Sequence, residues 1–146
     1  MNANIAFWDT SAIIPLCCNQ DFSFAARKVR RDFEVPVIWW GTPVEVHSSI
    51  NRLRREEFLR EGVSVQAING WQTFYLRSRK IRPDERLLRL AVSIPAAYDI
   101  RAMDAFQLAA ALVWCSERPR KRPFICADAR LGEAANDAGF EVLSLA

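Results

Sequence analysis

MDAFQLAAALVWC, residues 103–115, is apolar around almost its whole circumference when it is drawn as a helix. A helix without a polar face is expected to be buried. The run that follows it, Pro123–Ala127, is short and apolar, which is typical of a buried strand. Asn4–Trp8 and Val35–Trp40 are runs of the same kind, the second rich in β-branched and aromatic residues and ended by Gly41. The sequence therefore predicts buried strands packed with a buried helix.

The rest of the chain alternates between the two kinds of element. A last strand is expected at Phe140–Leu145. Helices are expected at Ser11–Cys18, Phe22–Phe33, Thr42–Leu59, Val63–Arg79, Pro83–Ala97 and Arg130–Ala138. Strands alternating with helices predict an α/β fold, in which a parallel sheet is covered on both faces. The 146 residues contain no repeat, linker or low-complexity tract, so we expect one domain over residues 1–146.

Composition limits the function classes. Hydrophobic residues make up 51% and charged residues 25%, which is normal for a folded domain. The apolar stretches are far shorter than the ~20 residues that cross a bilayer, and residues 1–4 lack a basic leader, so we expect a cytoplasmic protein without a membrane anchor. The four cysteines contain no C-x-x-C pair and fit buried, reduced thiols. Because His47 is the only histidine, any metal would be held mainly by carboxylates, as Mg²⁺ or Mn²⁺ are.

The positive charge is carried almost entirely by arginine. The net charge is +3, and 17 of the 20 basic residues are arginine. They gather within residues 27–31, 52–55, 77–82 and 118–122. Arginine pairs with phosphate through two parallel hydrogen bonds, so these clusters fit a polyanion-binding surface. Solvated helix faces explain them equally well.

Four acids lie close to the expected carboxyl ends of strands. Asp9 and Asp128 directly follow two of the strands, Glu45 lies in the first turn after the second strand, and Asp104 begins the buried helix. Ligands of parallel α/β folds bind beyond this edge of the sheet. We therefore expect the four carboxylates to converge there.

Each acid also has a purely structural explanation. Asp9 and Asp128 could cap helices, Thr42-x-x-Glu45 is a capping-box pattern, and Asp104 could favour the positive end of a helix. Caps need no convergence, however. Two carboxylates ~4 Å apart repel by ~4 kcal/mol at an effective dielectric of ~20, so a cluster needs a divalent cation or protonation. Carboxylate-bound magnesium is a standard activator of water against phosphodiesters.

The chain resembles PIN-domain ribonucleases, and among them the VapC-type toxins of bacterial toxin–antitoxin pairs. Four segments carry the resemblance in the family's order: Phe7–Ala12 (FWDTSA), Thr42–Val46 (TPVEV), Asp104–Ala111 (DAFQLAAA), and Phe124–Asp128 (FICAD) followed by Gly139–Val142 (GFEV). The third is the most specific. The resemblance implies a three-layer α/β/α sandwich with a short, mostly parallel sheet, and a metal-dependent endoribonuclease with one or two Mg²⁺ or Mn²⁺ ions.

The resemblance also assigns roles to single residues. Asp9, Glu45, Asp104 and Asp128 are implied to bind the metal and to be catalytic, with Ser11 in a supporting polar position. The sequence departs from the pattern beside Asp128. Many members have Thr or Ser where Cys126 stands and a second Asp where Arg130 stands. These departures weaken the case for Asp128 and for a second ion.

The implied partners are an RNA substrate, a cognate antitoxin and a second copy of the chain in a homodimer. Trp71, Phe74 and Tyr75 share one helix face at i, i+3 and i+4, and with the Leu53–Phe58 segment they are our candidate docking groove for the antitoxin. The alternative is that this stripe is core or a homodimer contact.

Two other functions are possible interpretations of the same residues. One is an aspartyl-phosphate phosphohydrolase with Asp9 as nucleophile, but its motif needs an acid where Ser11 stands. The other is a non-catalytic PIN-like module that binds RNA or protein, against which the retained acids count.

Overall fold

The central element is a five-stranded sheet, parallel throughout, in a computed structural model that describes residues 4–56 and 59–146. The strand order is β3-β2-β1-β4-β5. The strands are β1 (Ile5–Trp8), β2 (Val35–Trp39), β3 (Arg79–Ile81), β4 (Pro123–Cys126) and β5 (Glu141–Ser144). This confirms the predicted α/β class, and the sheet is wholly rather than mostly parallel.

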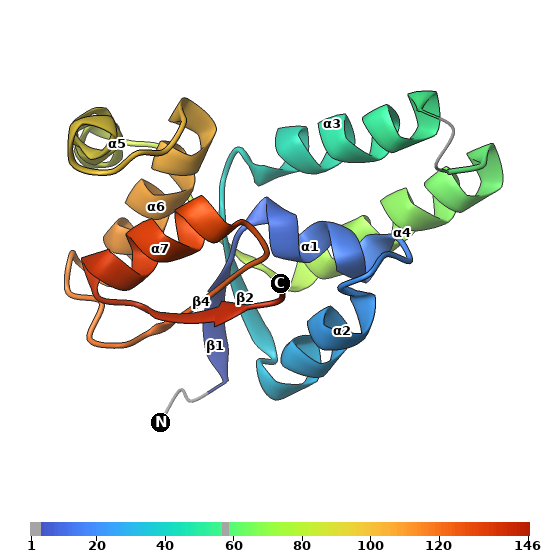
Figure 1. The fold of residues 1–146 in the computed structure, drawn as a ribbon, viewed down its shortest axis with the longest axis horizontal. Coiled ribbons are helices and arrows are strands. Elements are labelled where there is room, and N and C mark those ends of the chain that lie inside the picture. Colours follow the sequence, from blue (N-terminus) through green and yellow to red (C-terminus); the bar gives the residue numbers. More distant parts are fainter. Residues whose placement is uncertain (1–3, 57–58) are drawn as a thin grey trace.

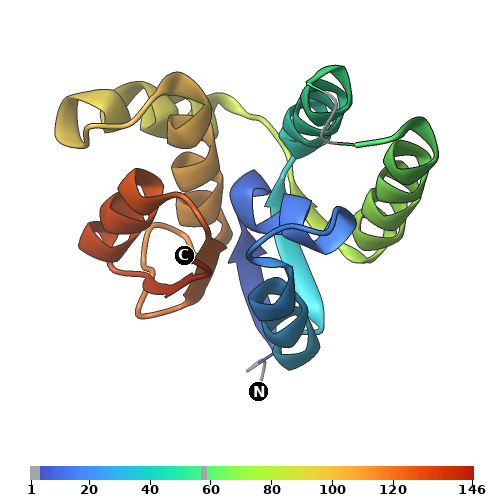
Figure 2. The ribbon, with the colours of Figure 1, turned by 45° about the vertical axis from the view of Figure 1, so that its right-hand side comes forward.

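Helices cover both faces of the sheet and make three layers (Figures 1 and 2). One layer holds α1 (Thr10–Cys17), α2 (Ser23–Asp32), α3 (Thr42–Arg55) and α4 (Glu61–Arg77). The other holds α5 (Glu85–Ala97), α6 (Ala102–Trp114) and α7 (Ala129–Ala138). Figure 2 shows the two groups separated by the sheet.

The strands supply two cores because successive side chains point to opposite faces. Phe7 and Phe124 pack with α5–α7, whereas Trp8 and Ile125 pack with α1–α4. Both faces are therefore apolar, as buried parallel strands require. Helix α6 is buried as predicted, and its Gln107 is 0% exposed among alanine and leucine neighbours.

Some boundaries differ from the sequence-based expectation. The predicted helix Val63–Arg79 ends at Arg77, and Arg79–Ile81 instead forms the edge strand β3 beside β2. The helix predicted from Pro83 begins at Glu85, because the Asp84 carboxylate caps it by accepting a hydrogen bond from the Leu87 N–H (2.8 Å). The ends of the other helices differ from the predicted ends by at most two residues. The exception is α3, which was predicted to end at Leu59 and ends at Arg55. Phe58 and residues 1–3, which the sequence analysis used, lie outside the described residues.

The prediction that α4 carries a docking stripe is wrong for Trp71 and Phe74. Trp71 is 3% and Phe74 5% exposed, because α4 packs against α1 and β2. The Phe74 ring meets Trp8 edge-on with ring centroids 5.5 Å apart. Tyr75 is half-buried, with the Lys80 ammonium 4.1 Å from its ring centroid. Trp71 and Phe74 are therefore core, which is one of the two alternatives given above.

Two smaller expectations concern thiols and membranes. Cys17, Cys18, Cys115 and Cys126 are all free thiols, and the predicted burial holds for all of them except Cys17, which is half-buried. None of the described helices is long and apolar enough to span a bilayer.

Candidate functional site

The ends of β1 and β4 bring Asp9 and Asp128 to the same edge of the sheet. These strands are neighbours, with Trp8 paired to Ile125, and the Asp9 N–H donates to the Ile125 carbonyl (3.0 Å). The order of the strands reverses between β1 and β4, which is where parallel α/β folds bind ligands. The first turns of α3 and α6 add Glu45 and Asp104.

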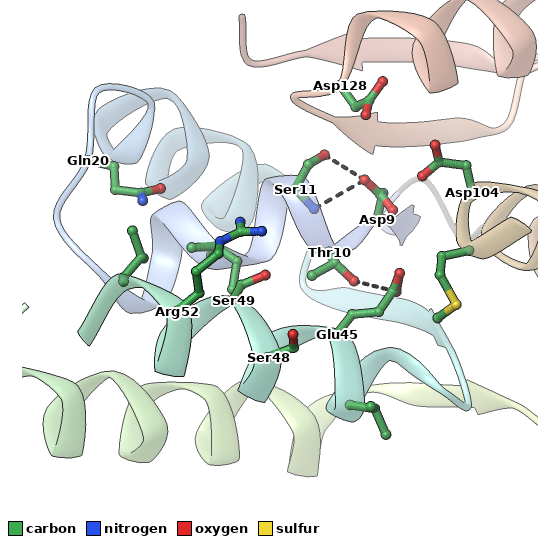
Figure 3. Close-up of a pocket in the computed structure, with 14 residues that line it drawn as sticks. Asp9, Thr10, Ser11, Gln20, Glu45, Ser48, Ser49, Arg52, Asp104 and Asp128 are labelled. Carbon is green, nitrogen blue, oxygen red and sulfur yellow. Dashed lines mark hydrogen bonds between the residues drawn. The ribbon is translucent and has the colours of Figure 1, made fainter. Parts of the chain in front are cut away.

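All four predicted acids line one pocket of about 520 Å³ (Figure 3), which we call the acidic pocket. Its lining also includes Ser11 and, further along α3, Arg52. Asp9 is 4% exposed, whereas Asp104 and Asp128 are half-buried. The structure therefore brings together the four carboxylates that the sequence analysis singled out.

Ser11 ties the two strand ends together at Asp9. The Asp9 Oδ2 accepts hydrogen bonds from the Ser11 N–H (3.1 Å) and the Ser11 hydroxyl (2.6 Å). The Ser11 Oγ in turn accepts from the Ala127 N–H beyond β4 (2.8 Å). Asp9 is thus both the cap of α1 and a wall of the pocket. Asp128 likewise caps α7 by accepting from the Leu131 N–H (3.0 Å).

Glu45 is held by side chains from two other elements rather than by a capping box. The cap of α3 is Gly41, with no side-chain cap bond, so the Thr42-x-x-Glu45 interpretation is wrong. The Glu45 Oε2 instead accepts from the Thr10 hydroxyl (2.9 Å) and from the Gln107 Nε2 (2.6 Å). The tertiary contacts of α1 and α6 therefore determine where this carboxylate points.

Thr10 and Gln107 are site residues that the sequence analysis did not single out. The Gln107 amide also lies within hydrogen-bond distance of the hydroxyls of Thr10 (3.2 Å) and Thr42 (3.3 Å). One signal could have found Gln107, because it is the one amide in the otherwise apolar stretch that follows Asp104. A buried amide needs polar partners, and acids are the nearest candidates.

Burial and mutual repulsion raise the pKa values of three of the acids, Asp9, Glu45 and Asp104. Burial raises the pKa of Asp9 from 3.8 to about 7, and the nearby charges of Glu45 and Asp104 add to the rise while the Ser11 hydrogen bonds oppose it. The pKa of Glu45 is raised by burial and further by Asp104. The pKa of Asp104 is raised by burial and then by Asp128. The four acids therefore interact electrostatically as one group.

The donor set fits a hard divalent cation in its chemistry. All four groups are carboxylates, and within the described chain none of them forms an ion pair with Lys or Arg. Within residues 4–56 and 59–146, no three side chains of His, Cys, Asp or Glu are gathered tightly enough to hold an ion as they stand. Repulsion between like charges holds such groups apart, and a cation that offsets this repulsion would draw them together.

The two departures beside Asp128 lie outside the pocket. Cys126 is 1% exposed, packs close to Gly132, and burial raises the pKa of its thiol to about 12. Arg130 is exposed on α7, with its guanidinium 3.8 Å from the Asp99 carboxylate. His47 lines a separate surface groove with Pro43, so it is not part of the acidic pocket.

No protein-family model and no curated protein matches the chain. Solved structures with a similar fold include the following two. A toxin–antitoxin complex from Klebsiella pneumoniae shares 15% identity over 97% of this chain and 98% of that chain, with a TM-score of 0.66. The protein PAE2754 from Pyrobaculum aerophilum shares 16% identity over 99% of this chain and 93% of that chain, with a TM-score of 0.55. The fold and the site define an α/β protein with a carboxylate-lined pocket at the switch point of a parallel sheet.

Proposed function

We propose that the protein is a metal-dependent endoribonuclease of the cytoplasm and the toxin of a toxin–antitoxin pair. The observation that carries the proposal is the convergence of four carboxylates from four separate segments in one pocket, where none of them forms an ion pair with another described residue. The similarity of fold to a chain of a toxin–antitoxin complex supports the same assignment. So do the sequence motifs that resemble PIN-domain ribonucleases of the VapC type.

Asp9, Glu45, Asp104 and Asp128 would hold one or two Mg²⁺ or Mn²⁺ ions. When bound, such an ion supplies a Lewis acid that activates water for attack and offsets the charge that develops on the phosphate. The neighbouring hydrogen bonds keep two of these carboxylates in place. Ser11 fixes Asp9, so its rotamer is set before a ligand arrives.

Glu45 is fixed in the same way by donors that belong to the fold. Thr10 and Gln107 direct one oxygen, Oε2, into their hydrogen bonds and leave Oε1 for a ligand. Donors of this kind orient metal ligands and are as important as the ligands themselves. The pocket is thus organised around its carboxylates by neutral hydroxyl and amide groups.

An antitoxin is the proposed protein partner. An amphipathic segment of that partner could place an arginine of its own against the acidic pocket, where the carboxylates would pair with it. This would block both the ion and the substrate. A homodimer is also part of the proposal, and sedimentation equilibrium of the purified chain tests it.

Cleavage of a labelled RNA by the purified protein tests the main proposal. We expect cleavage with Mg²⁺ or Mn²⁺, none with EDTA, and none by Asp104→Asn with either ion. Asp21→Asn is the matched control, because Asp21 is exposed and outside the acidic pocket. Full cleavage in EDTA, or by Asp104→Asn, would contradict the proposal.

The same preparation separates the two other functions. An aspartyl-phosphate phosphohydrolase would release phosphate from 4-nitrophenyl phosphate. We do not expect this activity, because the motif needs a second acid at position 11, where this chain has Ser11 hydrogen-bonded to Asp9. A non-catalytic module would bind RNA equally well with and without the ion and would never cut it.

A further inference from the structure

The acidic pocket has a second, chemically different end. Glu45, Ser48, Ser49 and Arg52 all line it from α3. Their spacing of three, four and seven residues places them on one face of the helix. In Figure 3 this face runs from the carboxylates to Arg52, with Gln20 beyond it. The wall therefore changes along α3 from anionic, through two hydroxyls, to cationic.

Arg52 is not used to neutralise the acids. It is the one basic residue among the described residues that line the pocket. It forms no ion pair with any residue in the described part of the chain. The guanidinium lies on the pocket side of α3, facing α1 (Figure 3). Its charge is therefore available to a ligand.

We propose that Arg52 binds a phosphate of a nucleotide next to the one whose phosphodiester is attacked. Arg52 follows Glu45 by seven residues, which is about 10 Å along the helix axis. That separation gives a ligand room for a second anionic group. A guanidinium binds a phosphate through two parallel hydrogen bonds, and Ser48 and Ser49 can donate to the strand between the two ends.

This inference rests on the proposed function and narrows its substrate class. The preferred substrate is a strand with at least two phosphates, one at the carboxylates and one at Arg52. A dinucleoside monophosphate meets only one end of the pocket. Arg52 thus selects for polymer over the smallest phosphodiester, without reading a base.

Binding tests Arg52 without any cleavage. The probe is a fluorescein-labelled single-stranded RNA of twelve nucleotides, in EDTA, followed by anisotropy while salt is varied. Arg52→Ala should weaken binding roughly tenfold or more and lower the slope of log K against log salt by about 0.7, the value for one phosphate contact. Arg54→Ala is the matched control, because Arg54 is an exposed arginine on the same helix that does not line the acidic pocket. It should keep the wild-type slope. An unchanged slope in Arg52→Ala, or an equal loss in Arg54→Ala, overturns the inference.

Kinetics with Mn²⁺ test the same idea on the reaction. We expect the wild type to show a kcat/KM roughly tenfold to a hundredfold higher for a trinucleoside diphosphate than for a dinucleoside monophosphate. Arg52→Ala should bring this ratio close to one, and Arg54→Ala should keep it. If the wild type cuts nothing while the binding result holds, the proposed function fails and the phosphate site stands. If it cuts RNA and the ratio survives in Arg52→Ala, the phosphate site fails and the proposed function stands.

Discussion

Replacing Asp9 by asparagine should stabilise the protein at neutral pH in the absence of a cation. The wild-type carboxyl has its pKa raised from 3.8 to about 7, chiefly by burial. Between these two values the folded chain holds a proton that the unfolded chain has lost, so stability falls as pH rises through this window. Each pKa unit corresponds to about 1.4 kcal/mol, so the free energy of unfolding falls by about 4 kcal/mol in all. This loss is complete once the pH is above 7.

Asparagine removes this loss and keeps the local contacts. Its Oδ1 can still accept from the Ser11 N–H and hydroxyl, which hold Asp9 now. We therefore expect Asp9→Asn to match the wild type near pH 4 and to exceed it by about 4 kcal/mol at pH 8. Urea unfolding in EDTA, followed by tryptophan fluorescence, measures the difference. The exposed Asp21→Asn serves as the control and should show none of this pH dependence.

A stability difference between Asp9→Asn and the wild type that stays constant from pH 4 to pH 8 would refute the reasoning. So would a variant that is less stable than the wild type at pH 8. Repeating the urea unfolding with added Mg²⁺ provides a second test. A bound cation should restore stability to the wild type at pH 8 and have less effect on the variant, which has one carboxylate fewer.

Three further outcomes are expected. Gln107→Leu should lower the free energy of unfolding by ~1–3 kcal/mol in urea, because Glu45 loses a buried donor, and an unchanged value would show that the hydrogen bond contributes nothing. Trp71→Ala should cost ~3–5 kcal/mol and lower the Tm, since the ring is core, and an unchanged Tm would contradict that assignment. Calorimetric titration with Mn²⁺ should show a smaller loss of affinity for Asp128→Asn than for Asp104→Asn, and an equal or larger loss would mean that the sequence departures beside Asp128 have no effect.

The sequence predicted the parts of the fold that depend on local pattern. The apolar stretch at residues 103–115 had to be buried, and the structure places it against the sheet. Strand β3 was missed because Arg79-Lys80-Ile81 is a short, charged edge strand with no buried alternation. Its conformation comes from pairing with β2, which is a contact between distant segments.

The sequence likewise predicted one part of the candidate site, the acids, but not the contacts that hold them. The acids could be placed because each lies near the end of a predicted strand, and topology alone brings such ends together. The bonds from Thr10 and Gln107 to Glu45 could not be placed, since they depend on how α1 and α6 approach α3. The aromatic spacing at Trp71 and Phe74 shows only that they share a face, and says nothing of what covers it.

The pairing of β1 with β4 has a consequence for the time at which the pocket forms. Asp9 follows β1 and is synthesised long before its neighbours Ala127 and Asp128, which follow β4. A nascent chain that has not yet released β4 from the ribosome lacks Asp128 and the Ala127 N–H that holds Ser11. Closing such a distant contact is also slow compared with forming local helices. The complete pocket therefore forms only after β4 has been made and has paired with β1.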